Sequence, residues 1–285
     1  AVLCEKPLGM DLPECEEMVA AVEKAGVVNM ICHNYRRIPA IALAKQMIAD
    51  GALGDRIYHF RARYAQDWIV DPAFPLVWRL RKEIAGLGTL GCIGSHIVDL
   101  GRYLVGEIGA VTGVMETFIK ERPLPENPEQ RGEVTVEDMA GWLARFENGA
   151  IGSFESTRFA TGRKNQIALE INGSGGSLVF DFEKMNRLEY YNAADPENAR
   201  GFRDILVTES THPYLSAWWP PGHLIGYEHT FVNTMADFIR AVVDGKSVQP
   251  TFADGLANER VLSAICQSAE TGQWVSPAAL GGGAS

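Results

Sequence analysis

The sequence has few cysteines and no long apolar run, and each shortage excludes a class of protein. The five cysteines among 285 residues are scattered and form no C-x-x-C pair, which argues against a disulfide framework and against a structural zinc site. Isolated cysteines in apolar surroundings are usually small buried residues of a reducing compartment, so we expect a cytoplasmic protein. No run of about 18 apolar residues suggests a membrane-spanning helix.

The sequence also has fewer basic than acidic residues. The 26 basic residues are outnumbered by 36 acidic ones, which gives a net charge of -10. This balance argues against nucleic acid or an anionic membrane as the main partner. A hydrophobic content of 46% and a charged content of 22% are ordinary for a globular protein. The length allows one large domain or two smaller ones.

The first 35 residues predict a strand, a helix and a second strand. The apolar run Ala1 to Cys4 indicates a buried strand, and a helix is expected from about Leu12 to Ala25, with Pro13 in its first turn and Gly26 after its end. A second apolar run, 27–32, predicts the next strand. Such a βαβ unit belongs to a parallel sheet. Because one unit is too little for a doubly wound sheet, we expect the chain to lack the front of such a domain.

The remainder predicts a different architecture, rich in antiparallel strands. Asn148-Gly149 separates two apolar runs, and the glycine-rich stretch 173–176 separates two more, as expected for hairpins. We therefore predict an antiparallel meander over 110–207 with one face on helices and the other free to pair with another subunit. A strand is expected within 54–67, helices over 39–49, 95–105, 227–243 and 255–271, and a flexible tail over 281–285.

Three segments carry residue types suited to chemistry. Glu5-Lys6-Pro7 stands at the carboxyl end of the first parallel strand, where open α/β sheets build their sites, and a lysine there can hold a substrate oxygen. The segment Cys32 to Arg37 ends the second strand and would face the same cleft. In a third segment, Trp219 offers an aromatic platform for a sugar ring, and His223 could bond hydroxyl groups. The alternatives are a solvated lysine, an ordinary strand-to-helix loop, and an aromatic loop that plugs the core.

A fourth segment, Gly91 to Leu100, is a glycine-rich lead into a helix. Cys92 and His96 are four residues apart and would share a helical face that Asp99 continues. Histidine has the pKa that suits a base for a hydroxyl proton near neutrality. The alternative is a core histidine bonded to Asp99. A metal site is not predicted, because two ligands are too few.

Together these segments resemble the Gfo/Idh/MocA oxidoreductases, named for glucose–fructose oxidoreductase and inositol dehydrogenase. The 219–227 segment is most similar to sugar dehydrogenases of the levoglucosan dehydrogenase type. The resemblance spans nearly the whole chain and rests on Glu5-Lys6-Pro7, Asn34-Tyr35-Arg36-Arg37 with Pro39, Trp78-Arg79, the run 91–100 and the helical segment 231–245.

The resemblance implies an α/β plus α+β fold. Residues 1–35 would be the C-terminal part of a Rossmann NAD(P)-binding domain whose N-terminal part is absent. Residues 36–280 would form a substrate-binding and oligomerisation domain with an open, mainly antiparallel sheet, through which a homodimer or homotetramer assembles.

It also implies roles for individual residues. His96 would be the acid/base catalyst and Lys6 would orient the reacting hydroxyl, while Cys92 occupies a position where the family usually has an aspartate. Pro7 would follow a cis peptide bond. The cofactor, NAD or NADP, would be bound by Glu5, Lys6, Pro7, Asn34, Arg36, Trp78 and Arg79, and the substrate by Tyr35, Arg36, His96, Trp219 and His223.

The sequence thus predicts an NAD(P)-dependent dehydrogenase that reversibly oxidises a secondary hydroxyl of a sugar, anhydrosugar or cyclitol. Two alternatives stay open. One is glycoside cleavage through transient oxidation, and the other is a non-catalytic regulator that senses a sugar or dinucleotide. Cys92 in place of the usual aspartate keeps the regulator open in particular, because a neutral thiol is only a weak hydrogen-bond donor.

Overall fold

The computed structural model describes residues 1–281, and its first three elements form a βαβ unit. Strands β1 (Val2–Glu5) and β2 (Asn29–Cys32) pair in parallel, with α1 (Leu12–Ala25) between them in the chain. The Asp11 side chain caps α1 by accepting from the Glu14 amide at 3.0 Å, and Gly26 ends it with φ of 59°. The predicted helix and the parallel pairing are confirmed.

An eight-stranded sheet dominates the rest of the molecule, in the order β12-β11-β10-β9-β3-β8-β7-β4. Every neighbouring pair is antiparallel except β3 with β8. The strands are β3 (Ile57–Ala65), β4 (Ile108–Glu116), β7 (Met139–Phe146), β8 (Ile151–Thr157), β9 (Gln166–Gly173), β10 (Gly176–Asp181), β11 (Arg187–Asn192) and β12 (Arg203–Leu206), and a separate small pair is β5 (Glu121–Pro123) with β6 (Arg131–Glu133).

The predicted hairpins at 148–149 and 173–176 are present, but the simple meander is wrong. Strand β3 inserts between β8 and β9, so that a segment from early in the chain lies in the middle of the later strands. Alternating apolar residues indicate a strand but carry no information on which strand will be its neighbour. The mainly antiparallel character of the sheet is confirmed.

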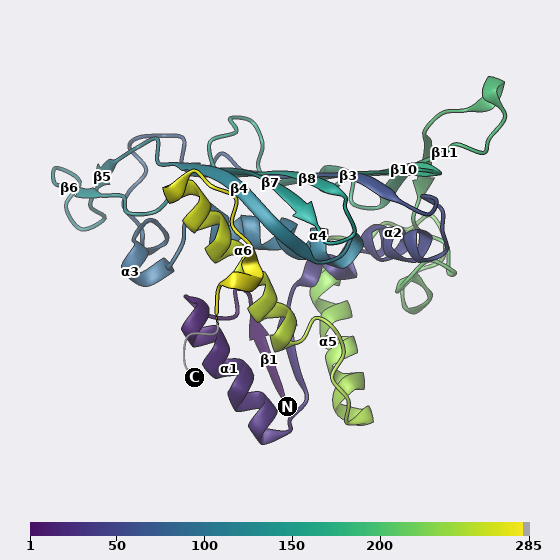
Figure 1. Cartoon of the computed structure of the whole chain (residues 1–285), viewed down its shortest axis with the longest axis horizontal. Helices are drawn as coiled ribbons and strands as arrows, with labels where there is room; N and C mark the ends of the chain where they lie inside the picture. The colour runs from purple at the N-terminus through teal and green to yellow at the C-terminus, as the bar shows by residue number, and fades with distance from the viewer. Residues whose placement is uncertain (282–285) are drawn as a thin grey trace.

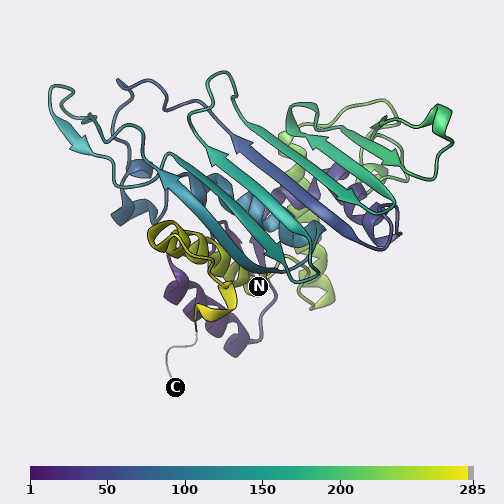
Figure 2. The same ribbon diagram turned by 45° about the horizontal axis from the view of Figure 1, so that its top comes forward.

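Helices cover one face of the large sheet, and the other face is uncovered (Figures 1 and 2). The helices are α2 (Pro39–Ala49), α3 (Lys82–Ala85), α4 (Ser95–Leu104), α5 (Tyr227–Asp244) and α6 (Phe252–Thr271). The helix-covered face of the sheet is apolar: the ring of Phe154 stacks on Trp142 at 5.0 Å between centroids and lies 5.4 Å from Phe60. The βαβ unit lies on the helix side of this sheet (Figure 1).

A π-helical turn, Leu90–Gly94, leads directly into α4. The Ser95 amide donates to the carbonyl of Leu90, five residues earlier. Single π-helical turns are frequent at functional sites, and the prediction of a glycine-rich lead into a regular helix did not foresee this one.

The segment Lys82–Leu104 is long and apolar enough to cross a membrane by length and composition, with a mean hydropathy of 1.3. The expectation that no segment would qualify was therefore wrong. In the fold, 72% of its most apolar window is buried inside the protein, the pattern of a core helix. Apart from Gly281, the predicted tail lies outside the described residues.

Candidate active site

The carboxyl ends of β1 and β2 bring the first two predicted segments together. Glu5 pairs in register with Cys32, so the residues that follow each strand, Lys6 and His33, leave the sheet at the same edge. The Lys6–Pro7 peptide bond is cis, as the resemblance implied. This edge faces the π-helical turn that precedes α4.

Lys6 reaches that turn directly. Its Nζ donates a hydrogen bond to the carbonyl oxygen of Cys92 at 2.5 Å. Burial lowers the pKa of the Lys6 ammonium below its usual 10.5; the neighbouring Cys92 and Glu5 side chains oppose this shift, and the charges of Arg158 and Arg79 add to it. The Lys6 side chain is partly exposed. The lysine and the helix that carries His96 are therefore held in one site.

His96 lies in a cage of rings. Its imidazole centroid is 4.6 Å from that of Tyr35 and 5.9 Å from those of Tyr64 and His33. The side chain is 7% exposed, and its Nδ1 has no hydrogen-bond partner within residues 1–281. Burial, followed by the charges of Lys6 and His33, holds the pKa of His96 well below its usual 6.5. The ring is therefore neutral near pH 7, the form that accepts a proton.

A chain of polar contacts extends from Tyr35 to residues that the sequence analysis did not single out. The hydroxyls of Tyr35 and Tyr64 lie 2.9 Å apart, and Tyr64 donates to Oδ1 of Asn165 at 2.8 Å. Gln66 donates to the same oxygen at 2.8 Å and accepts from the Trp68 indole at 2.9 Å. Burial raises the pKa of the Tyr64 hydroxyl to about 12, so it stays a neutral donor. The alternation of β3 could have indicated that Tyr64 points inward.

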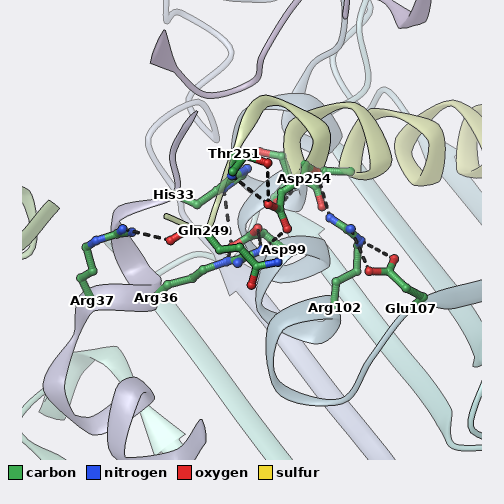
Figure 3. A network of polar contacts seen from close by, with 11 residues as sticks. His33, Arg36, Arg37, Asp99, Arg102, Glu107, Gln249, Thr251 and Asp254 are labelled. Atoms are coloured by element: carbon green, nitrogen blue, oxygen red, sulfur yellow. Dashed lines mark hydrogen bonds and ion pairs between the residues drawn. The ribbon is translucent and has the colours of Figure 1, made fainter. Parts of the chain in front are cut away.

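Arg36 is used in a buried ion-pair network rather than left free (Figure 3). Its guanidinium donates to both oxygens of Asp99, at 2.9 and 2.6 Å, lies 3.7 Å from Asp254, and stands 4.9 Å from the Tyr103 ring. The Asp99 charge raises the pKa of Arg36 against the effect of burial. Its charge is therefore already paired with carboxylates of α4 and α6, and contact of Arg36 with substrate and cofactor stays a prediction.

Asn34 and the pair Trp78-Arg79 lie differently. The Asn34 amide donates to the Thr230 hydroxyl at 2.8 Å and is buried. Trp78 is exposed, with the Arg79 guanidinium 4.3 Å from its ring. The charge of Arg79 adds to the lowering of the Lys6 pKa, and contact of Trp78 and Arg79 with the cofactor stays a prediction.

In the aromatic segment after residue 217, Tyr227 lies near the rings around His96, whereas Trp219 and His223 were the residues predicted there. Trp219 and His223 are exposed, and no ring contact joins either one to the His96 cage in the described part of the chain. Tyr227 instead lies 6.0 Å from the Tyr35 ring. The Trp218 indole donates to Asn233 at 3.1 Å, so part of this segment does pack as a plug. Substrate contact by Trp219 and His223 stays a prediction.

The comparisons with known proteins agree with this geometry. The family model described as the GFO/IDH/MocA C-terminal domain matches residues 41–179. Levoglucosan dehydrogenase of Pseudarthrobacter phenanthrenivorans is 44% identical over 288 residues, which cover 96% of this chain and 73% of that protein. The chain therefore belongs to the Gfo/Idh/MocA family of oxidoreductases, and the family prediction is confirmed.

Solved structures are similar over the same extent. The oxidoreductase domain protein from Kribbella flavida has a TM-score of 0.94 and 53% identity, covering 96% of this chain and 74% of that one. Levoglucosan dehydrogenase in complex with NADH and levoglucosan has a TM-score of 0.92 and 46% identity, covering 96% and 72%.

Proposed function

We propose that this chain acts in reversible hydride transfer between NAD(P) and a secondary hydroxyl of a sugar, anhydrosugar or cyclitol. The observation that carries the proposal is the hydrogen bond from Lys6 Nζ to the Cys92 carbonyl, four residues before His96. It brings an ammonium group and a neutral imidazole, whose Nδ1 is unpartnered in the described chain, to one site. The names of the relatives confirm the predicted class, an NAD(P)-dependent oxidoreductase of sugar hydroxyls.

Lys6 and His96 would have different roles at the substrate hydroxyl. The Lys6 ammonium would donate to the substrate oxygen, orient it, and oppose the negative charge that develops there. His96 would accept the hydroxyl proton, since its lowered pKa keeps it neutral at pH 7. In the reverse direction the same imidazole returns the proton. Nicotinamide, when bound, supplies the acceptor for the hydride.

In the described chain His96 Nδ1 has no hydrogen-bond partner, and Lys6 Nζ donates to one acceptor, the Cys92 carbonyl. Both groups can therefore form further hydrogen bonds to ligands. We infer that Glu5 at the end of β1, Lys6 and Pro7 after it, and Asn34 after β2 would lie against the nicotinamide end of the cofactor. Trp78 and Arg79 would cover it from the other side, because both are exposed and Arg79 is close enough to influence Lys6.

Turnover assays test this function. The full-length protein is offered a panel of sugars, anhydrosugars and cyclitols with NAD and with NADP, and nicotinamide absorbance is followed. We expect reduced cofactor to accumulate with at least one member. Product formation without net reduction of cofactor would instead indicate glycoside cleavage through transient oxidation, and tight binding without turnover would indicate a regulator.

We also propose that the chain forms a homodimer or homotetramer through the uncovered face of the large sheet. Val114, Leu143 and Ile151 are exposed there on adjacent strands, and large apolar side chains on an open sheet favour burial against another copy.

The domain division and the location are proposals of the same kind. Residues 1–35 would belong to the NAD(P)-binding domain and 36–280 to the substrate domain, because the β1–β2 pair is separate from the large sheet. Protection of 1–35 from proteolysis by NAD(P) would support this division.

A cytoplasmic location, supported by the five free cysteines, is tested by cell fractionation.

A further inference from the structure

We infer that Glu137 is a positioning residue for the proposed reaction: it holds the helical turn whose Cys92 carbonyl binds Lys6. The inference rests on the proposed function, because it concerns the lysine and the helix of the same site. Glu137 acts through the backbone of that turn rather than on the substrate.

Glu137 lies just before β7 and accepts hydrogen bonds from three consecutive backbone amides. Its carboxylate oxygens accept from Gly88 at 3.0 Å and from Leu90 at 2.8 Å, and its backbone carbonyl accepts from Thr89 at 3.1 Å. These amides begin the helical segment that continues through the π-helical turn into α4. The first amides of a helix have no partner within it, and a negative charge there interacts favourably with the helix dipole. Glu137 therefore caps this segment from a distant part of the chain.

The segment has no cap of its own. The Thr89 hydroxyl, which begins the segment and is of the type that caps helices, has no hydrogen-bond partner within residues 1–281. Gly91 and Gly94 weaken the turn further, since glycine has a low helix propensity. The Glu137 side chain is 8% exposed, so water has little access to replace its bonds. The turn therefore depends on Glu137 for the partners of its first amides.

The absence of a side chain at Gly88 makes this contact possible. A Cβ at residue 88 would lie 2.2 Å from the Glu137 carbonyl oxygen and 3.0 Å from the Glu137 amide nitrogen, so any side chain there would push the two segments apart. The Gly88 carbonyl in turn accepts from the Cys92 amide at 3.1 Å. The residue that Glu137 holds therefore carries Cys92 directly.

Cys92 connects the cap to the catalytic groups. Its carbonyl oxygen accepts from Lys6 Nζ at 2.5 Å, and this is the one hydrogen bond of that ammonium in the described residues. His96 lies four residues further along the same segment. Without the cap this turn can shift, and Lys6 and His96 are then no longer placed for the same hydroxyl. Misplacement of a catalytic group by about 1 Å can lower a rate about a hundredfold.

Two substitutions break the contact from opposite sides. E137Q keeps the size of the side chain but turns an NH2 group toward one of the two backbone amides, and G88A places a methyl group against the Glu137 carbonyl oxygen. In the full-length protein each should lower kcat at least about tenfold and change KM less than about threefold. The double variant should lose little more than either single variant, because both break one contact.

Two control variants make matched changes elsewhere. D11A removes the cap of α1, and G109A adds a methyl group in β4, where a Cβ would meet its nearest neighbours at an ordinary 3.6 Å. Their kcat should stay within about twofold of the unmodified value.

The state of Lys6 is measured without turnover. Competitive labelling with acetic anhydride over a range of pH, followed by mass spectrometry, gives the pKa of the Lys6 amine, with Lys24 of α1 as an internal reference. A hydrogen bond to an ammonium favours its charged form, so its loss in E137Q and in G88A should lower the pKa of Lys6 by about one unit. D11A should leave that pKa unchanged.

The inference stands if both kcat and the pKa of Lys6 fall in E137Q and G88A. A lower kcat with an unchanged Lys6 would assign the loss to the fold in general, and an unchanged kcat would show that the contact has no role in the reaction; either result overturns the inference and leaves the dehydrogenase function standing. If E137Q does not fold, G88A decides alone. If no sugar reduces the cofactor, the dehydrogenase function fails, and labelling of Lys6 then decides whether Glu137 positions it.

Discussion

Arg36 and Asp99 form a fully paired, buried contact: two parallel hydrogen bonds at 2.9 and 2.6 Å join the guanidinium to the carboxylate. The contact ties the turn after β2 to α4, three residues after His96. It holds the helix that carries His96 against the βαβ unit.

Breaking this pair should destabilise the protein strongly. D99N leaves the Arg36 charge buried without its bidentate partner, and loss of one member of a buried pair costs about 3–5 kcal/mol. Chemical denaturation measures the free energy of unfolding. D204N, which removes the exposed partner of Arg187, should cost less than about 1 kcal/mol. Similar small losses in both variants would contradict the structural role assigned to Arg36.

Removing either catalytic group should abolish most turnover. H96A deletes the proton acceptor and K6A the group that orients the hydroxyl, so each should lower kcat at least about a hundredfold, the scale of an acid/base group. K24A, on the exposed side of α1, is the control. Near-normal kcat in both H96A and K6A would remove the basis of the proposed mechanism.

The pH profile of kcat/KM should reflect both lowered pKa values. His96 is the active base when neutral, so activity should persist below pH 6.5 and fall only at more acidic pH. Lys6 acts as an ammonium, so the alkaline limb should fall below pH 10.5. Initial rates measured from about pH 5 to about pH 10 check both limbs of the profile. An acid limb centred at or above 6.5 would show that His96 is not the base.

Acid should weaken the fold through His33. Burial lowers the pKa of His33 from 6.5 to about 4, so the unfolded chain binds more protons between these values. Stability is then full above pH 6.5 and is lost as pH falls toward 4, by on the order of 3 kcal/mol. Urea unfolding at pH 7 and pH 5 should show this loss, and H33Q should reduce it, whereas H223Q, at an exposed histidine, should not. If H33Q loses as much free energy of unfolding between pH 7 and pH 5 as the unmodified protein, the loss belongs to other groups.

The uncovered sheet face should control assembly. L143K places a charge on that face, where Leu143 is 47% exposed, and should shift the particle toward the monomer in light scattering after size-exclusion chromatography. V243K, on α5 away from the sheet and 79% exposed, should leave the mass unchanged. A monomeric unmodified protein, or an unchanged mass in L143K, would argue against this interface.

Local elements were predictable because their signals are local. Helix α1 begins and ends where Asp11, Pro13 and Gly26 place it, and the turn at Asn148-Gly149 joins β7 to β8 as expected. Lys6 and His96 could be proposed because a lysine at a strand end and a histidine on a glycine-rich helix suit hydroxyl chemistry.

Contacts between distant residues were not predictable in the same way. The sequence did not indicate that the charge of Arg36 is paired with Asp99 and Asp254. Tyr64 and Asn165 joined the site only because β3 lies beside β9. Arg158 gave no signal at all, since nothing in its neighbourhood along the chain distinguishes a buried arginine from a surface one.

The sequence by itself determined the helices, the hairpins, the family and the two central groups, Lys6 and His96. Tertiary structure alone decided that Lys6 bonds the Cys92 carbonyl, that Arg36 is paired, and that Arg158 is buried against Trp68. The physical reason is that propensity and capping act over a few residues, whereas burial and charge pairing depend on which distant segments the fold brings together.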